Sequence, residues 1–255
     1  MKHILLSIQY DGTNYLGWQR QPNALTIQGV VEEAIERITG TATTVAASGR
    51  TDSGVHALGQ TASFFTESRL TPNIFQKALN ALLPYDIRVI SAELAAADFH
   101  CRFSATRKRY FYVIYNDSPV SPFVYRYVWH VKHALDVEAM QRASETLKGR
   151  HDFKSFCAAD TDVQSSVREI FAIAIEPLPC ISFLDTMITG KFIKLTIDAD
   201  GFLRHMVRNI TGTLVDVGRG KTDASAIQQI LNAKDRKKAG VTAPGRGLFL
   251  DRVFY

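Results

Sequence analysis

The residues with the clearest chemical potential lie in one short stretch, residues 48–57. It combines two glycines, Arg50, Asp52, His56 and three hydroxyl side chains. Glycine permits backbone conformations that other residues resist, and hydroxyl side chains bond to nearby backbone groups, so the stretch predicts a stiff loop. Such a loop presents a carboxylate beside a cation, which suits nucleophilic or acid–base chemistry. The alternative is a polar hairpin turn in which Asp52 only caps the backbone.

Two apolar runs, at residues 43–47 and 61–65, flank this loop and predict the strands that hold it. Upstream, apolar residues recur with helical spacing between Thr26, which can cap a helix, and Gly40, which can end one. Further elements are expected as a strand at 2–10, a helix at 72–83 and a strand at 86–94. This order of elements is similar to the split βαβ class.

A second half with a similar mix of elements begins near residue 105. Its expected strands and helices lie at 106–115, 167–175, 191–198 and 248–254, and at 136–148, 202–217 and 223–233, respectively. No low-complexity segment or long linker separates the two halves. We therefore expect an α+β fold in which two similar halves, residues 1–104 and 105–255, share a central mixed, mainly antiparallel sheet.

Composition narrows the class of protein. The 255 residues are 46% hydrophobic and carry a net charge of +5, which favours a polyanionic partner such as nucleic acid. Three scattered cysteines argue against a disulfide framework and against a thiolate metal site. No signal-peptide pattern or membrane-length apolar run is present. We therefore expect a cytoplasmic protein.

A metal centre is not expected. His130 and His133 form an H-x-x-H pair, and His151 precedes Asp152, but neither pair has a third ligand within reach in the sequence. The basic turn at residues 218–221 lacks the spacing of a phosphate-binding loop. These residues therefore indicate no metal or phosphate-loop chemistry.

The predicted strand at 107–115 interleaves cations with aromatic rings. Strand periodicity places Lys108, Tyr110 and Tyr112 on one face. Tyrosines on a positive surface suit base stacking and phosphate neutralisation. The alternative is a strand with its rings in the core and its cations in solvent.

The predicted helix at 202–217 carries Arg204 and Arg208 one turn apart, beside its buried stripe. Arg208 follows Val207, so we expect it at the edge of the core. An arginine there needs an anionic partner, because burying the charge unpaired is costly. Asp52 and Asp216 are the two candidate partners.

Four segments together resemble the tRNA pseudouridine synthase A family. They are YDGTNYLGWQRQ at 10–21, SGRTDSGVHA at 48–57, RKRYFY at 107–112 and GFLRHMVRN at 201–209. The resemblance implies an isomerase that converts uridine to pseudouridine in the tRNA anticodon stem-loop, at positions 38, 39 and 40. It further implies two α+β halves with a cleft between them, a homodimer, and no metal or organic cofactor.

The resemblance also assigns roles to four residues. Asp52 matches the catalytic aspartate, and Arg208 matches the basic residue that pairs with it. Tyr110 matches the tyrosine that stacks on the target base, and Arg50 matches the arginine that helps to hold the flipped base. The segment 158–191 carries no family motif, so its role is open.

Two other classes of protein are also considered. A catalytically silent RNA-binding module would need the aromatic and basic strand, but it would not need the Arg50 and Asp52 loop. A metal-dependent nuclease would need clustered carboxylates or histidines, which the sequence lacks.

Overall fold

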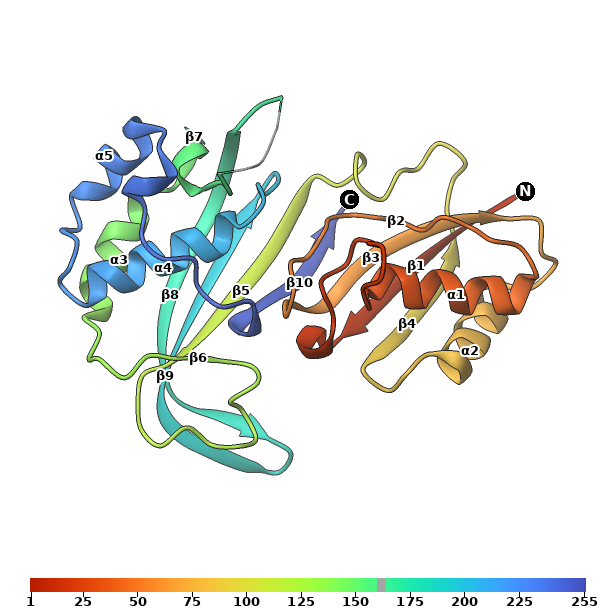
Figure 1. Cartoon of the computed structure of the whole chain (residues 1–255), viewed down its shortest axis with the longest axis horizontal. Helices are drawn as coiled ribbons and strands as arrows, with labels where there is room; N and C mark the ends of the chain where they lie inside the picture. The colour runs from red at the N-terminus through yellow and green to blue at the C-terminus, as the bar shows by residue number, and fades with distance from the viewer. Residues whose placement is uncertain (160–163) are drawn as a thin grey trace. The chain divides into compact units, whose positions relative to one another are not determined.

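The computed structural model describes residues 1–159 and 164–255 (Figure 1). The chain forms two compact units, Met1–Lys108 with Phe249–Tyr255, and Arg109–Leu248. The boundary expected from the sequence follows residue 104. The closing strand, however, belongs to the first unit, because Phe249 and Leu250 pair in parallel with His56 and Ala57.

The first unit is built on a sheet with the strand order β4-β1-β3-β10. These strands are β1 (Lys2–Tyr10), β3 (His56–Thr66), β4 (Ile87–Leu94) and β10 (Leu248–Phe254). β1 runs antiparallel to both β3 and β4. A short strand, β2 (Ala46–Ala47), pairs with β3 and replaces the longer run expected at 43–47.

Two helices pack side by side on this sheet (Figure 1). They are α1 (Ile27–Thr39) and α2 (Pro72–Leu82). The expected caps are confirmed, since the side chains of Thr26 and Thr71 accept hydrogen bonds from Gly29 N and Ile74 N. Gly40 ends α1 with a φ of 71°, which a residue with a Cβ adopts only with strain.

The second unit has the strand order β5-β9-β8-β7. The strands are β5 (Arg107–Tyr115), which starts at the end of the first unit, β6 (Trp129–His130) beside it, β7 (Gly149–Asp152), β8 (Val167–Phe183) and β9 (Thr186–Ala199). The β8–β9 hairpin is longer than expected and takes up most of the motif-free segment 158–191. Pro177 and a register shift between Leu178 and Cys180 interrupt the alternating pattern, so composition did not reveal its full length.

Three helices complete this unit, α3 (Val137–Glu145), α4 (Met206–Gly218) and α5 (Ala226–Ala233). The expected start of α4 at residue 202 is wrong. His205 adopts the left-handed conformation with a φ of 65°, so the helix begins at Met206 and Arg204 precedes it. Within the residues that the structure describes, the short 3-10 turns are η1 (Gly12–Asn14), η2 (Lys154–Phe156), η3 (Arg236–Lys238) and η4 (Gly245–Gly247). The α+β class, with mixed and mainly antiparallel pairing, is confirmed.

Three further observations concern both units. Within residues 1–159 and 164–255, no helix combines the length and apolar character that a membrane span needs. The same residues contain no group of three or more His, Cys, Asp or Glu arranged to hold a metal ion. Cys101, Cys157 and Cys180 are free thiols.

Candidate active site

The loop that carries Asp52 connects β2 to β3. A hydrogen bond of 3.2 Å from the Val55 amide to the Asp52 carbonyl turns its backbone, and Gly54 has a positive φ of 72°. Thr51 is buried, Asp52 is half-buried and Arg50 is exposed. The loop therefore presents a carboxylate and a guanidinium beside each other in the chain, on a backbone whose conformation is held locally.

A second loop, residues 11–25, packs directly against the Asp52 loop. The Trp18 amide donates to the Thr51 carbonyl at 3.0 Å, and the Gly54 amide donates to the Tyr15 carbonyl at 3.3 Å. Gly17 has a φ of +86°, and a Cβ there would lie 2.5 Å from the Thr51 carbonyl oxygen. Two segments that appeared as separate motifs in the sequence therefore form one structural unit around Asp52.

Gly17→Ala is expected to lower both stability and turnover. The left-handed conformation costs an alanine about 1–2 kcal/mol, and the added methyl group must also displace the Thr51 backbone beside Asp52. We expect a lower melting temperature and a loss of turnover of about tenfold or more. Both are measured by thermal unfolding and by single-turnover kinetics.

Gly40→Ala is the matched control for this substitution. Gly40 has a similar φ of +71°, but nothing lies within 4 Å of an added Cβ. Gly40→Ala therefore carries the backbone strain without the displacement of Thr51, and we expect it to lower stability while leaving turnover by the folded protein unchanged. Equal turnover in the two variants would contradict the proposed link between Gly17 and the Asp52 loop.

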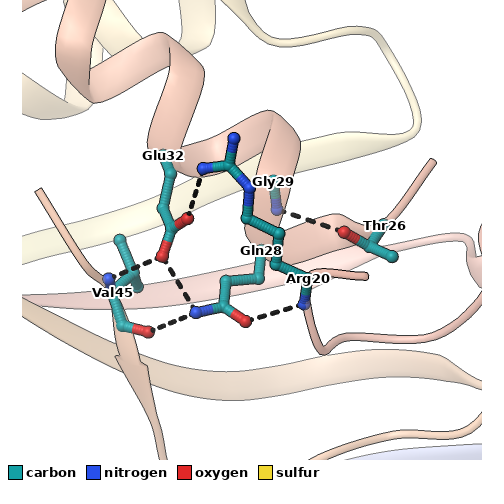
Figure 2. Close-up of polar contacts among 6 residues, drawn as sticks. All are labelled: Arg20, Thr26, Gln28, Gly29, Glu32 and Val45. Atoms are coloured by element: carbon teal, nitrogen blue, oxygen red, sulfur yellow. Dashed lines mark hydrogen bonds and ion pairs between the residues drawn. The ribbon is translucent and has the colours of Figure 1, made fainter. Parts of the chain in front are cut away.

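The far end of the 11–25 loop is fixed by a buried polar cluster on α1 (Figure 2). Gln28 accepts a hydrogen bond from the Arg20 amide at 2.9 Å and donates to the Val45 carbonyl at 3.2 Å. Glu32 accepts from the Val45 amide at 3.0 Å and forms an ion pair of 3.1 Å with Arg20. Val45 precedes β2, so one turn of α1 anchors both the 11–25 loop and the chain that enters the Asp52 loop.

His56 is a structural residue of this region. Its ring is buried and stacks on Phe249 with the centroids 4.7 Å apart. Its Nδ1 atom lies 3.0 Å from an Asp11 carboxylate oxygen and 3.1 Å from the Gly12 amide nitrogen. A protonated Nδ1 donates to Asp11, whereas an unprotonated Nδ1 accepts from Gly12. In either state His56 fastens the start of β3 to the η1 turn.

In the second unit, Tyr110 and Tyr112 lie on the same face of β5. Tyr110 is 7% exposed, and its ring meets Phe202 edge to face with centroids 5.0 Å apart. Tyr112 is fully buried, and its hydroxyl donates to the Pro244 carbonyl at 2.8 Å. Burial raises the pKa of Tyr112 well above its usual value. The interpretation that the rings of this strand lie in the core therefore holds for Tyr112, and Tyr110 is buried as well.

Arg208 lies half-buried on α4, at the edge of the core as expected. Its Nε donates to the Ala243 carbonyl at 2.7 Å, and the Ala243 amide donates to the Arg208 carbonyl at 3.1 Å. A Cβ at Gly212 would lie 1.7 Å from the Val241 carbonyl oxygen, so α4 approaches this segment closely. Packing of α4 against residues 241–243 therefore orients Arg208, and nothing in the local sequence pattern indicated this support.

Two buried amide side chains beside the candidate residues had no expected role. Asn209 donates to the Phe156 carbonyl at 2.8 Å and accepts from the Thr242 hydroxyl at 2.7 Å. Gln60 lies under the Asp52 loop and is fully buried. The sequence feature that could have identified Gln60 is its position in the strand. Gln60 shares the inward face of β3 with Ala62 and Phe64, where polar residues are unusual.

The four candidate site residues divide between the two units. Arg50 and Asp52 lie in the first, and Tyr110 and Arg208 lie in the second. A family model described as tRNA pseudouridine synthase matches residues 6–104 and 143–255. The chain belongs to the tRNA pseudouridine synthase family. The family expected from the sequence is thereby confirmed, and with it the expectation of an isomerase.

Relatives of this synthase match it over its full length. Proteins named tRNA pseudouridine synthase A are 42% identical over 255 residues in Thermodesulfovibrio yellowstonii and 44% over 255 in Caldicellulosiruptor bescii. A third, from Moorella thermoacetica, is 46% identical over 257 residues. Each match covers 100% of this chain and 100% of the relative.

The matched ranges of the family model include some candidate residues of the synthase and leave out another. Arg50 and Asp52 lie in its first matched range and Arg208 in its second, whereas Tyr110 falls in the unmatched interval between them. The full-length relatives do span Tyr110. The assignment of Tyr110 therefore depends on the 107–112 motif and on its place on β5.

Proposed function

We propose that this synthase isomerises uridine to pseudouridine in tRNA, at positions 38, 39 and 40 of the anticodon stem-loop. The full-length similarity to proteins named tRNA pseudouridine synthase A carries the proposal. The rigid support of the Asp52 loop agrees with it, because catalysis requires a group held in a fixed position.

The chemistry requires few groups. The bond between N1 of uracil and the ribose C1′ breaks, the base turns, and a bond forms between C5 and C1′. The proton on C5 is lost and N1 gains one, so the reaction is neither an oxidation nor a reduction. The Asp52 carboxylate can attack the substrate as a nucleophile or remove a proton as a base. An ionised carboxylate also stabilises positive charge that develops at C1′.

The other three residues are proposed to assist Asp52. Arg208 is proposed to be the basic residue that pairs with Asp52, as the family resemblance implies. Arg50 and Tyr110 hold the base after it leaves the stack, a step that costs a few kcal/mol in nucleic acid. In this proposal Tyr110 stacks on the base, and its hydroxyl is available to carry a proton.

Tyr110→Phe is expected to reduce turnover less than Tyr110→Ala. A ring that stacks on a base contributes about 1–3 kcal/mol, so alanine should cost roughly 5- to 150-fold in kcat/KM. Phenylalanine retains the ring and its edge-to-face contact with Phe202. Steady-state kinetics on a tRNA transcript measures the difference.

Tyr112→Phe is the control for the loss of a hydroxyl from the same face of β5. It removes the hydrogen bond to Pro244 in the core, so we expect a lower melting temperature and unchanged kcat/KM of the folded enzyme. If Tyr110→Phe is as inactive as Tyr110→Ala, the hydroxyl is a proton carrier and stacking is not the main contribution.

The proposed activity is tested with pure enzyme, an unmodified tRNA transcript and EDTA. We expect pseudouridine at positions 38, 39 and 40, formed at the same rate with and without the chelator. Pseudouridine at other positions would contradict the proposed site. Cleavage of the tRNA that EDTA prevents would indicate a nuclease, and binding without conversion would indicate a silent RNA-binding module.

We further propose that the protein acts in the cytoplasm as a homodimer. The homodimer follows from the family resemblance, and the cytoplasmic location follows from the cysteine usage and the apolar pattern of the sequence. The net charge of +5 suits a tRNA partner better when two copies combine their basic residues. Sedimentation equilibrium tests the dimer, and a single species with the mass of one 28.4 kDa chain would contradict it.

A further inference from the structure

We propose that Gln60 is a positioning residue for catalysis, whose amide group holds the segment that carries Asp52 on both sides of Arg50. The proposal rests on the proposed catalytic role of Asp52. Gln60 lies on β3, eight residues beyond Asp52, and its side chain is 0% exposed. The amide therefore exchanges no hydrogen bonds with bulk water.

The first contacts of Gln60 are with the residues before Arg50. Its Nε2 donates to the Gly49 carbonyl at 2.8 Å, and its Oε1 accepts from the Ser48 hydroxyl at 2.7 Å. The orientation of the amide is determined, because a carbonyl oxygen can only accept and must face the nitrogen. The Ser48 amide also donates to the Thr61 carbonyl at 2.8 Å. The entry to the loop is thus bound to β3 at two consecutive residues.

The second contacts reach the residue between Arg50 and Asp52. Nε2 of Gln60 lies 3.4 Å from the Tyr10 hydroxyl, which lies 2.8 Å from the Thr51 hydroxyl. Burial raises the pKa of Tyr10 well above its usual value, so the phenol keeps its proton. The arrangement that satisfies all three groups has Gln60 donating to Tyr10 and Tyr10 donating to Thr51.

These contacts hold Ser48, Gly49 and Thr51, while Arg50 is exposed and Asp52 is half-buried. Ser48 and Thr51 are buried like Gln60. When a buried donor or acceptor loses its partner, the full desolvation penalty remains, so the backbone is expected to shift to recover a hydrogen bond. A shift of about 1 Å at a catalytic group can cost about 10²-fold in rate.

The test compares Gln60→Met with the wild-type enzyme in steady-state kinetics on a tRNA transcript. Methionine keeps the length and approximate volume of glutamine but cannot donate to Gly49 or Tyr10. We expect kcat to fall about 10²-fold, while KM and the dissociation constant for tRNA change less than about threefold. Assays are run well below the melting temperature of every variant.

Asn80→Leu is the matched control. Asn80 on α2 also binds backbone through its amide, donating to the Val89 carbonyl at 2.8 Å and accepting from the Val89 amide at 2.9 Å. These bonds fasten α2 to β4 and involve no residue of the Asp52 loop. We expect a lower melting temperature with kcat unchanged, so that stability and positioning are separated.

A double-mutant cycle tests the route of the effect. Tyr10→Phe removes only the hydroxyl between Gln60 and Thr51, and we expect about a tenfold fall in kcat. If both residues act through the loop, the kcat losses of Gln60→Met and Tyr10→Phe will not add in the double variant. If Gln60→Met fails to fold, Tyr10→Phe and Ser48→Ala carry the test, and unchanged kcat in both overturns the proposal.

The same measurements distinguish a failure of the positioning role of Gln60 from a failure of the catalytic role of Asp52. With Asp52→Asn inactive, a kcat for Gln60→Met no lower than that of Asn80→Leu overturns the positioning role alone. Near wild-type conversion by Asp52→Asn overturns the catalytic role of Asp52, and the positioning role with it. Additive losses in the double-mutant cycle also overturn it, because independent effects do not share one loop.

Discussion

Asp52→Asn is expected to abolish turnover while the fold and most of the affinity for tRNA remain. Asparagine has nearly the same shape as aspartate, but its neutral amide is neither a nucleophile nor a base at neutral pH. Loss of a group of this kind costs roughly 10⁴-fold or more in rate. The expected measurement is a single-turnover rate of pseudouridine formation reduced by at least that factor.

The structure explains why we expect this substitution to leave the fold intact. The loop is held through Gly17, Thr51 and Gln60, and these contacts do not require a carboxylate at position 52. Affinity for tRNA depends mainly on phosphate contacts, so the dissociation constant should change little. The melting temperature and a filter-binding constant test both statements.

Asp98→Asn serves as the control for the loss of one negative charge from the same unit. Asp98 is exposed, so its substitution should leave rate, affinity and melting temperature unchanged. Pseudouridine formation by Asp52→Asn at a rate close to that of Asp98→Asn would remove Asp52 from the catalytic role. A large loss of melting temperature in Asp52→Asn would instead assign it a structural role.

Arg208→Ala is expected to have the second largest effect and to lower both turnover and stability. The guanidinium donates to the Ala243 carbonyl, and hydrogen bonds that involve a charged group contribute about 1.5–3 kcal/mol. If Arg208 also orients Asp52, its loss removes an electrostatic contribution that is usually about 10²- to 10³-fold in kcat. Thermal unfolding and kcat, measured on the same preparation, give the two effects.

Arg208→Lys separates charge from shape. Lysine keeps the positive charge but lacks the planar fork that can serve Ala243 and a carboxylate together, so we expect only partial recovery of kcat. Arg142→Ala is the control, because Arg142 is an exposed arginine on α3 paired with Glu138 at 3.8 Å, and surface pairs contribute little. Unchanged rate and melting temperature in Arg208→Ala would contradict the proposed pairing of Arg208 with Asp52.

Elements with strong local signals could be predicted from the sequence. The helix ends were predicted correctly at Thr26 and Gly40 of α1 and at Thr71 of α2. Capping depends on hydrogen bonds between residues close together in the chain, so local sequence reveals it. The predicted start of α4 was wrong, because no sequence pattern indicates that His205 adopts the left-handed conformation. The pairing of β10 with β3 joins residues far apart in the chain, which no local pattern encodes.

By itself, the sequence determined the family and the residue types available for chemistry. The motif at 48–57 contains the carboxylate and the guanidinium, and their identities do not depend on how the chain folds. The tertiary structure decided what supports them. Tyr10 meets Thr51 and Gln60 because β1 and β3 pair with Ile8 opposite Gln60, and a register shift after Ile8 places Tyr10 opposite Ala57. A shift of one residue would turn Gln60 away from the loop, since successive side chains of a strand point to opposite faces.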